Sequence, residues 1–318
     1  MKAIRIHNIG GPEVMRLEDV PEPTPGKGEA VVKIAAAGLN FIDIYFRIGL
    51  YKAAQFPFTP GHEGAGTVSA VGEGVTEVKA GDRVAYAMAM GSYAEYAAVP
   101  AWRLVKLPDS VDFKVGAAIM LQGMTAHYLT HSTYALGKGH KAVVHAAAGG
   151  VGLLLTQIAK KLGATVYATA GNEAKAELAR GAGADEVIIY AKQDFETEVK
   201  RLAGGGVDVV YDSVGATTFE KSLNCLKPRG YMILYGQSSG PVPPVDPGTL
   251  MSKGSLFLTR PTLTHYAMSR DEILSRTKFL FESGVKFKVD HVFPMAEAGK
   301  AHEALAGRQT TGKVVLVP

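Results

Sequence analysis

The stretch Ala142-Val143-Val144-His145-Ala146-Ala147-Ala148-Gly149-Gly150-Val151-Gly152 decides the fold, because a short apolar run leads into a glycine-rich turn and then directly into a helical pattern over Val151–Leu162. Small residues let the main chain approach a diphosphate closely, and the first turn of a helix offers unpaired N–H groups. The motif departs from G-x-G-x-x-G, since Ala147 holds the first glycine position while Gly149 and Gly152 hold the other two. The stretch predicts a dinucleotide site that includes Ala148, Gly149, Gly150 and Val151.

The chain from this stretch onward alternates between short β-branched runs and helical patterns. Strands are predicted over Ala142–His145, Thr165–Ala168, Glu186–Tyr190, Val207–Tyr211, Gly230–Tyr235 and Ser255–Thr259. Helices are predicted between the first five of them, over Val151–Leu162, Glu173–Arg180, Asp194–Leu202 and Thr217–Leu226. This order is typical of βαβ crossovers, so we predict an α/β fold with a doubly wound parallel Rossmann sheet of six strands. Ligands of such a sheet bind beyond the carboxyl ends of its strands.

The composition restricts the class of protein. The 318 residues suggest two domains, and 47% hydrophobic residues are enough for two packed cores. The formal net charge of +4 comes without long Lys or Arg blocks, so we expect no nucleic-acid partner. Cys225 is the only cysteine and lies in a predicted helix, which excludes an intramolecular disulfide and is typical of a reducing cytoplasm. No apolar run reaches the roughly 18 residues of a membrane span, so we predict a cytoplasmic protein with no membrane partner.

The first part of the chain has a different pattern, in which short alternating strands are broken by Pro and Gly turns. Strands are predicted over Lys2–Ile6, Ala30–Ala36, Gly64–Val71, Arg83–Ala87 and Tyr93–Val99, which is typical of a β-barrel. After Pro261 the pattern predicts one more helix, Arg270–Phe281, and a final strand, Lys313–Val317, that returns to the first domain. We therefore predict one domain from residues 1–122 and 266–318, and a Rossmann domain from residues 123–265.

Several motifs occur in an order that resembles the medium-chain dehydrogenase/reductase superfamily. They are Gly61-His62-Glu63-Gly64-Ala65-Gly66, Ala80-Gly81-Asp82-Arg83-Val84 and the turn at Gly149. The chain is most similar to the zeta-crystallin-like quinone oxidoreductase branch, through Gly38-Leu39-Asn40-Phe41-Ile42-Asp43-Ile44-Tyr45, Gln122-Gly123-Met124-Thr125-Ala126, Tyr211-Asp212-Ser213-Val214-Gly215 and Leu258-Thr259-Arg260-Pro261. The resemblance implies a GroES-like β-barrel catalytic domain, hydride transfer from NADPH to a quinone in a cleft between the domains, and a homodimer.

The residues that could bind a metal are too few for a zinc site. Asn40 stands where the resemblance places a cysteine ligand, and residues 86–102 contain no cysteine. His62 and Glu63 supply one imidazole and one carboxylate, whereas a catalytic zinc needs about three protein ligands. We predict no metal and a structural role for this pair, with a labile metal as the alternative. Without a Lewis acid, reduction of an electrophilic acceptor is favoured over alcohol oxidation.

Asn40, Asp43 and Tyr45 are the predicted catalytic residues. The resemblance places them at the nicotinamide end of the cofactor, and an amide and a phenol can donate hydrogen bonds to a developing oxyanion. Asn40 is therefore also predicted to contact the cofactor. The alternative is that Asn40 and Asp43 only cap or hold the loop.

The end of the second Rossmann strand distinguishes NADPH from NADH. Glu173 is a candidate acceptor for the ribose diol of NADH, but Asn172 is a natural N-cap, which places Glu173 in the first helical turn for helix stability. The resemblance implies that Gly171, Lys175 and Tyr190 hold the 2′-phosphate of NADPH. We predict NADPH, with Lys175 on a solvated helix face as the alternative.

The other predicted cofactor contacts lie after later strands and near the domain boundaries. Met124 and Thr125 are predicted to begin a helix that faces the nicotinamide, and the remaining contacts are Val214, Gly215, Gly236, Gln237 and Ser238. The resemblance implies that Lys313 touches the diphosphate.

Two further functions are left open by the sequence. A reductase of conjugated enones or enoyl thioesters would use the same hydride geometry, and RNA binding would need a basic, aromatic face that the dispersed lysines do not predict. The apolar edge strand Ser255–Thr259 predicts pairing with a second copy into a homodimer.

Overall fold

The computed structural model describes the whole chain, Met1–Pro318, and divides it into two compact units. The first unit consists of Met1–Met124 and Ala267–Pro318, and the second unit of Thr125–Tyr266. The sequence predicts boundaries after residues 122 and 265, and the units divide after Met124 and Tyr266. No helix combines the length and the apolar character that a membrane crossing requires.

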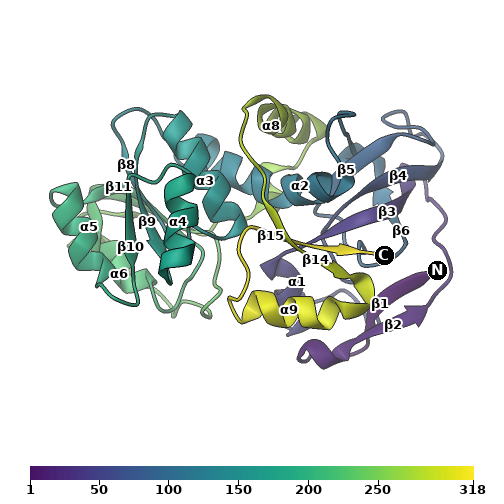
Figure 1. Ribbon diagram of the computed structural model, residues 1–318, viewed down its shortest axis with the longest axis horizontal. Helices are drawn as coiled ribbons and strands as arrows, with labels where there is room; N and C mark the ends of the chain where they lie inside the picture. Colours follow the sequence, from purple (N-terminus) through teal and green to yellow (C-terminus); the bar gives the residue numbers. More distant parts are fainter. The chain divides into compact units, whose positions relative to one another are not determined.

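The second unit is built on a six-stranded sheet in the order β10-β9-β8-β11-β12-β13, in which every neighbouring pair is parallel. The strands are β8 (Lys141–Val144), β9 (Thr165–Ala170), β10 (Glu186–Ile189), β11 (Val207–Asp212), β12 (Leu226–Leu234) and β13 (Phe257–Thr259). The helices are α3 (Gly150–Lys161), α4 (Glu173–Gly181), α5 (Phe195–Ala203), α6 (Phe219–Asn224) and α7 (Pro247–Ser252). Figure 1 shows α3 and α4 on one face of the sheet and α5 and α6 on the other. The predicted doubly wound Rossmann sheet is confirmed.

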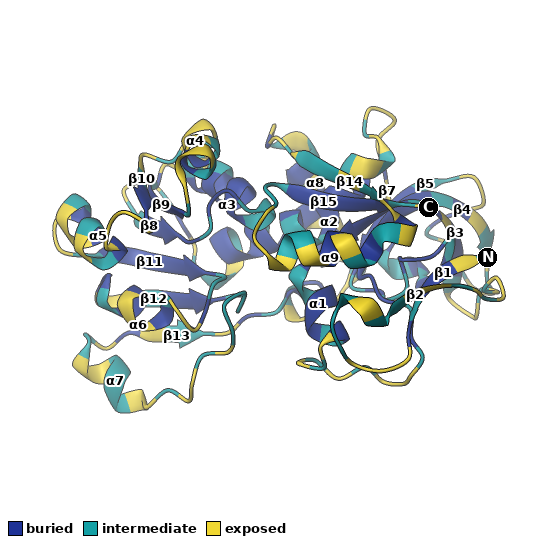
Figure 2. Ribbon diagram, turned by 60° about the horizontal axis from the view of Figure 1, so that its bottom comes forward, coloured by how far each residue is buried: buried dark blue, intermediate teal, exposed yellow.

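The strands of this sheet are buried because helices cover both faces. All six residues of β11 are buried, as expected for a central parallel strand, and Figure 2 shows it dark blue throughout. Asn172 caps α4 by accepting a hydrogen bond from the backbone N–H of Lys175, and Asp194 caps α5 in the same way through Thr197. Because all the strands of this sheet are parallel, their carboxyl ends lie at the same edge. The predicted cofactor residues follow the strands at this edge.

The region around Cys225 corrects the predicted helix Thr217–Leu226. The helix α6 ends at Asn224, Cys225 is the residue that follows it, and Leu226 already pairs with Val207 in the sheet. The backbone N–H of Val207 also bonds to the carbonyl of Cys225 at 2.9 Å. Sheet pairing overrides the local helical pattern here. Burial raises the pKa of the Cys225 thiol to about 12.

The first unit contains two sheets. A seven-stranded sheet has the order β14-β15-β3-β4-β5-β7 with β6 paired to β3, and a two-stranded sheet joins β1 and β2. The strands are β1 (Lys2–Ile6), β2 (Met15–Asp19), β3 (Glu29–Leu39), β4 (Glu63–Val71), β5 (Arg83–Ala87), β6 (Tyr96–Pro100), β7 (Val105–Lys106), β14 (Val289–Pro294) and β15 (Lys313–Val317). The final strand β15 pairs with β3, so the predicted return of the C-terminus to the first domain is observed.

The helices of the first unit correct three predictions. They are α1 (Phe41–Arg47), α2 (Phe113–Tyr128, whose last residues belong to the second unit), α8 (Arg270–Glu282) and α9 (Ala298–Ala306). The helix predicted to begin at Met124 and Thr125 begins at Phe113 instead, because Asp112 accepts a hydrogen bond from the N–H of Val115 at 2.9 Å. The sequence pattern predicts only one helix after Pro261, so α9 is an addition, and it predicts no helix at α1.

Short helical turns complete the chain. They are Pro12–Val14, Ala101–Arg103, Leu263–Tyr266 and Met295–Glu297, with a π-helical turn at Leu129–Thr133.

Candidate active site

The turn after β8 presents free backbone donors. Gly149 is the N-cap of α3, and the first i to i+4 bond of this helix joins the N–H of Leu153 to the carbonyl of Gly149 at 2.9 Å. The N–H groups of Gly150, Val151 and Gly152 therefore precede the first bond of the helix and have no acceptor within it. The predicted diphosphate residues Ala148, Gly149, Gly150 and Val151 form this turn, which is suited to an anion.

Gly152 is required by the close approach of helix and turn. A Cβ atom at this position would lie 2.4 Å from the carbonyl oxygen of Ala146 and 2.7 Å from the Cα of Ala147. Both neighbours are backbone atoms, so no side chain can move aside. This is the third glycine of the predicted motif, and its packing role agrees with the one that the motif requires.

The loop after β9 brings together two of the three residues predicted to hold a 2′-phosphate. A Cβ atom on Gly171 would lie 2.8 Å from the hydroxyl of Tyr190, which is 48% exposed. Lys175 lies in the first turn of α4, capped by Asn172. The Glu173 carboxylate accepts a hydrogen bond from Arg180 at 2.9 Å, and this bond lowers the pKa of the carboxyl. Glu173 therefore has the helix-stabilising role that the sequence predicts.

Asp212, at the end of β11, organises the loops that carry the next predicted contacts. Its Oδ1 accepts hydrogen bonds from the N–H groups of Val214 at 2.7 Å and Gly215 at 3.0 Å. The loop after β12 is tied to this one, because the N–H of Ser238 bonds to the carbonyl of Ser213 at 3.1 Å. The structure thus brings the predicted residues Val214, Gly215, Gly236, Gln237 and Ser238 into one region. The sequence did not reveal this role of Asp212, although an Asp at the end of an apolar central strand is a signal for it.

His145 is the second residue of this region whose role the sequence did not reveal. Its Nδ1 lies 3.0 Å from Thr169 Oγ1, and its Nε2 lies 2.9 Å from Ser222 Oγ, which in turn bonds to Asp212. Burial lowers the pKa of His145, so the ring is neutral at neutral pH. Its polar contacts link the ends of β8, β9 and β11.

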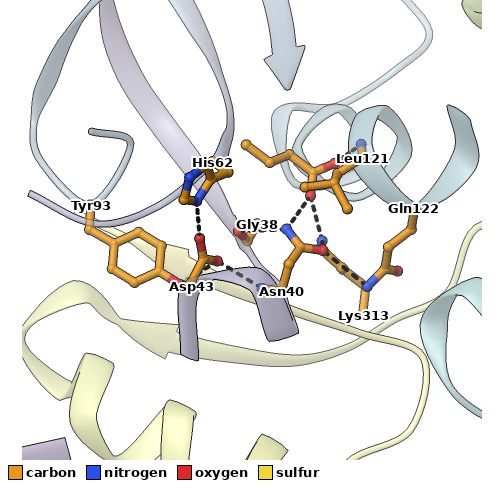
Figure 3. A network of polar contacts seen from close by, with 9 residues as sticks. Gly38, Asn40, Asp43, His62, Tyr93, Leu121, Gln122 and Lys313 are labelled. Atoms are coloured by element: carbon orange, nitrogen blue, oxygen red, sulfur yellow. Dashed lines mark hydrogen bonds and ion pairs between the residues drawn. The ribbon is translucent and has the colours of Figure 1, made fainter. Parts of the chain in front are cut away.

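In the first unit, Glu63 is the centre of a buried polar network, and Figure 3 labels its partners Asn40, Leu121 and Lys313. The carboxylate is fully buried, and its Oε1 accepts the N–H of Leu121 at 2.7 Å. Its Oε2 accepts hydrogen bonds from Asn40 Nδ2 at 2.9 Å and from Lys313 Nζ at 2.5 Å. Gly38 leaves room for this carboxylate, since a Cβ there would lie 2.4 Å from Oε2.

Lys313 is held within this network. Its side chain is 2% exposed, and its ammonium bonds to Asn40 Oδ1 at 2.7 Å as well as to Glu63. Burial lowers the pKa of Lys313, and the Glu63 carboxylate opposes this shift. The predicted contact of Lys313 with a diphosphate has no support in these contacts, because the ammonium already has two buried partners. The sequence lacked any sign of this pairing, since Lys313 and Glu63 are distant along the chain.

Both polar atoms of the Asn40 side chain have hydrogen-bond partners. Its Nδ2 donates to Glu63 Oε2 and to the carbonyl of Gly38 at 3.2 Å, and its Oδ1 accepts from Lys313 Nζ and from Gln122 Nε2 at 3.4 Å. Both amide hydrogens are therefore in use. The arrangement favours the alternative in which Asn40 holds the loop, and its contact with cofactor or acceptor stays a prediction.

Asp43 joins α1 to the start of β4. Its side chain is fully buried. Its Oδ2 accepts the N–H of Asn40 at 2.9 Å, which caps α1, and the hydroxyl of Tyr93 at 3.2 Å. Its Oδ1 lies 2.6 Å from His62 Nδ1. Figure 3 shows the Asp43 carboxylate between the side chains of His62 and Tyr93. These contacts are those of a positioning carboxylate, since none of its oxygens lacks a donor.

Tyr45 lies on the same helix but in an aromatic cluster. Its ring packs against Tyr51 with centroids 5.3 Å apart and against Phe41 at 6.2 Å, and its side chain is 8% exposed. The structure brings Asn40 and Asp43 into direct contact, and it places Tyr45 among aromatic rings. No group of three or more His, Cys, Asp or Glu side chains is arranged to hold a metal ion.

Comparison with known proteins assigns both units to described families. The alcohol dehydrogenase GroES-like domain matches residues 26–109, which confirms the predicted GroES-like domain, and the zinc-binding dehydrogenase family matches residues 150–279.

Relatives match over nearly the full length. The quinone oxidoreductase of Pseudomonas aeruginosa is 46% identical over 100% of this chain and 99% of its own. The 2-haloacrylate reductase of a Burkholderia species is 42% identical over 98% of each chain. The Escherichia coli quinone oxidoreductase, solved in complex with NADPH, superposes with a TM-score of 0.98 at 43% identity over 100% of both chains. The chain therefore belongs to the quinone oxidoreductase branch of the medium-chain dehydrogenase/reductase superfamily.

Proposed function

We propose that this protein is an NADPH-dependent quinone oxidoreductase that works without zinc. The observation that carries the proposal is the full-length similarity, at 46% and 43% identity, to two quinone oxidoreductases, one of them solved with NADPH. The reaction is transfer of a hydride to a quinone or a related electrophile, and NADPH supplies that hydride when it is bound.

The second unit offers residues that fit the cofactor. The turn at Gly149–Gly152 has unpaired N–H groups and no room for a Cβ at Gly152, which suits a diphosphate. Gly171 and Tyr190 lie together beside the start of α4, where Lys175 supplies a positive charge. We assign these three residues to the 2′-phosphate and the loops after β11 and β12 to the rest of the cofactor.

The donor set of the first unit does not fit zinc. His62 uses Nδ1 on Asp43, and Glu63 uses both oxygens on other partners, one of them the ammonium of Lys313. Asn40 supplies an amide and the unit contains no cysteine. We infer that the acceptor must already be electrophilic. Tyr45 is the side chain that we assign to hydrogen bonding of the developing oxyanion, while Asn40 holds the Glu63 and Lys313 pair.

A second candidate activity is reduction of conjugated carbonyl compounds. The similarity to 2-haloacrylate reductase over 98% of the chain favours it, because that acceptor is a conjugated double bond. A comparison of benzoquinone with cyclohexenone as acceptors separates the two, since a quinone reductase turns over the first fast and the second slowly, and an enone reductase shows the reverse order.

The proposal is tested by steady-state oxidation of NADPH and NADH with benzoquinone, after treatment with a chelator. We expect the chelator to leave turnover unchanged and NADPH to be preferred. Lys175→Ala should raise the KM for NADPH about 10-fold, the effect of losing an interaction of about 1.4 kcal/mol with the phosphate, and leave the KM for NADH unchanged. Lys161→Ala, an exposed lysine at the end of α3, is the matched control. Equal KM values for NADPH and NADH in the unmodified protein would contradict the cofactor assignment, and loss of turnover on chelation would contradict the absence of zinc.

A further inference from the structure

We propose that His62 donates the proton that completes the reduction, with Asp43 as its positioning residue. This inference rests on the proposed function. It concerns a residue for which the sequence analysis predicts only a structural role or a labile metal.

The imidazole of His62 is fixed in place from three directions. The preceding Gly61 has φ of 95°, and a Cβ there would lie 2.2 Å from Ser92 Oγ and 2.3 Å from Tyr93 Cδ1. The His62 carbonyl accepts the N–H of Met88 at 2.7 Å. The ring stacks on Phe46, with centroids 4.8 Å apart and planes at 29°. A ring held in this way can present one nitrogen reproducibly.

The hydrogen bonds around Asp43 determine which nitrogen that is. A carboxylate only accepts, so the Tyr93 hydroxyl donates to Oδ2, and Tyr93 must accept from His302 Nε2 at 3.3 Å. The Asn40 N–H also donates to Oδ2. A carboxylate has no proton to donate, so His62 Nδ1 donates its proton to Oδ1 at 2.6 Å. The carboxylate orients the ring and stabilises the positive charge of its doubly protonated form.

The other ring nitrogen of His62 is available. Nε2 makes no hydrogen bond within the protein. Some polar atoms without a partner are fully buried, such as Nδ1 of His302 and Nε of Arg47, but Nε2 of His62 is not one of them. The His62 side chain is 7% exposed, so Nε2 reaches the surface at the edge of a largely buried ring. An oriented imidazole with one buried and one accessible nitrogen is the arrangement of a general acid.

The step balances for both acceptor classes. With a conjugated carbonyl, the hydride forms a C–H bond at the β-carbon, the electron pair of the double bond moves toward the carbonyl oxygen, and the Nε2–H proton goes to the α-carbon. With a quinone, the hydride forms an O–H bond at one carbonyl oxygen, the electron pair moves through the ring onto the other oxygen, and the Nε2–H proton goes to that second oxygen. The acceptor gains two electrons and the nicotinamide loses them, and the neutral imidazole regains a proton from water. Because water can also protonate an oxygen, the enone depends more on His62.

The test compares His62→Gln with unmodified protein, using NADPH and cyclohexenone. We expect turnover to fall about 100-fold, the contribution of a positioned general acid, with a smaller loss for benzoquinone and an unchanged Kd for NADPH. Added imidazole should restore part of the activity of His62→Ala, which a purely structural role would not allow. His7→Gln is the matched control, because His7 forms an exposed pair with Glu18 at 2.8 Å and should leave turnover unchanged.

A readout without cofactor covers the case in which the variants do not fold. In isotope-labelled protein, NMR should show a downfield Nδ1–H proton of His62 that moves upfield in Asp43→Asn. Undiminished cyclohexenone turnover in His62→Gln, or a proton found on Nε2 alone, would overturn the inference. If the unmodified protein oxidises NADPH with benzoquinone, such a result leaves the proposed function intact. Failure with every acceptor would instead defeat the proposed function.

Discussion

At the scale of single residues, position 152 has no space for a side chain, so only glycine fits there. The N-terminus of α3 rests directly on the turn after β8, with backbone atoms closer than any Cβ could tolerate. A glycine is needed here for packing as well as for access to the N–H groups, so one substitution should affect both stability and cofactor binding.

Gly152→Ala should lower the free energy of unfolding by about 1–3 kcal/mol, the usual cost of overpacking, and weaken NADPH binding as α3 moves away from the turn. Gly181→Ala is the matched control, because Gly181 ends α4 with nothing within 4 Å of the added Cβ. Urea unfolding and a fluorescence titration with NADPH measure the two effects. An alanine variant as stable as the unmodified protein would show that the turn can relax.

Two of the three predicted catalytic residues, Asn40 and Asp43, hold other groups in place. Asn40 and Asp43 have every polar atom occupied by neighbours, so their chemistry is to hold other groups. Sequence analysis could name these residues from a motif, but it could not see their partners. Lys313 comes from the far end of the chain, and His62 is the residue before β4.

At the scale of elements, the helix α9 carries a buried histidine against the first unit's core. His302 is fully buried, and burial lowers its pKa to about 4. The ring therefore stays neutral in the folded protein, while in the unfolded chain it takes up a proton below its ordinary pKa of about 6.5. The unfolded state binds more protons in this range, so stability is lost as the pH falls from about 6.5 to 4.

We expect the free energy of unfolding to fall by about 2 kcal/mol more between pH 7 and pH 5 in the unmodified protein than in His302→Gln, at 1.36 kcal/mol per pKa unit. Urea titrations at the two pH values measure this difference. His265→Gln, which changes an exposed histidine, should retain the full pH dependence. Identical pH dependence in His302→Gln would show that the imidazole takes up its proton as readily in the folded protein as in the unfolded chain.

At the scale of the whole molecule, the edge of the Rossmann sheet is the feature that bears on association with a second copy. The strand β13 is the last of its sheet and pairs only with β12. Phe257 on this strand is 50% exposed although its ring stacks on Tyr231, and Met251 nearby in the sequence is 72% exposed. Leu256, also predicted to be at the bare edge, is buried at 6% and packs in the core of the second unit. An exposed edge with apolar side chains invites pairing.

We propose that the protein is a homodimer through β13, and that Phe257→Asp converts it to a monomer. Sedimentation at micromolar concentration measures the state, with Val292→Asp as the control. Val292 is 45% exposed on β14, at the edge of the other large sheet, and its substitution should leave the dimer intact. A monomeric unmodified protein would refute the pairing.

The sequence by itself determined the six strands of the second unit, the helices between the first five of them and the turn that is suited to a dinucleotide, but it did not predict α7. These features depend on local patterns, namely β-branched runs, helix caps and the glycines at positions 149 and 152, so they can be read from neighbouring residues. The predicted end of the helix Thr217–Leu226 was wrong, because pairing of Leu226 with Val207 outweighs a local propensity.

Only the tertiary structure decided what the polar residues of the first unit do. Glu63, Lys313 and Asn40 satisfy one another in the interior, and Asp43 turns His62 so that one nitrogen is buried and the other accessible. Each of these pairings joins residues that are far apart in the chain, and a buried charge is stable only with its partner in place. A motif can name such residues, but the partner that sets the role of each is known only once the strands β3, β4 and β15 come together.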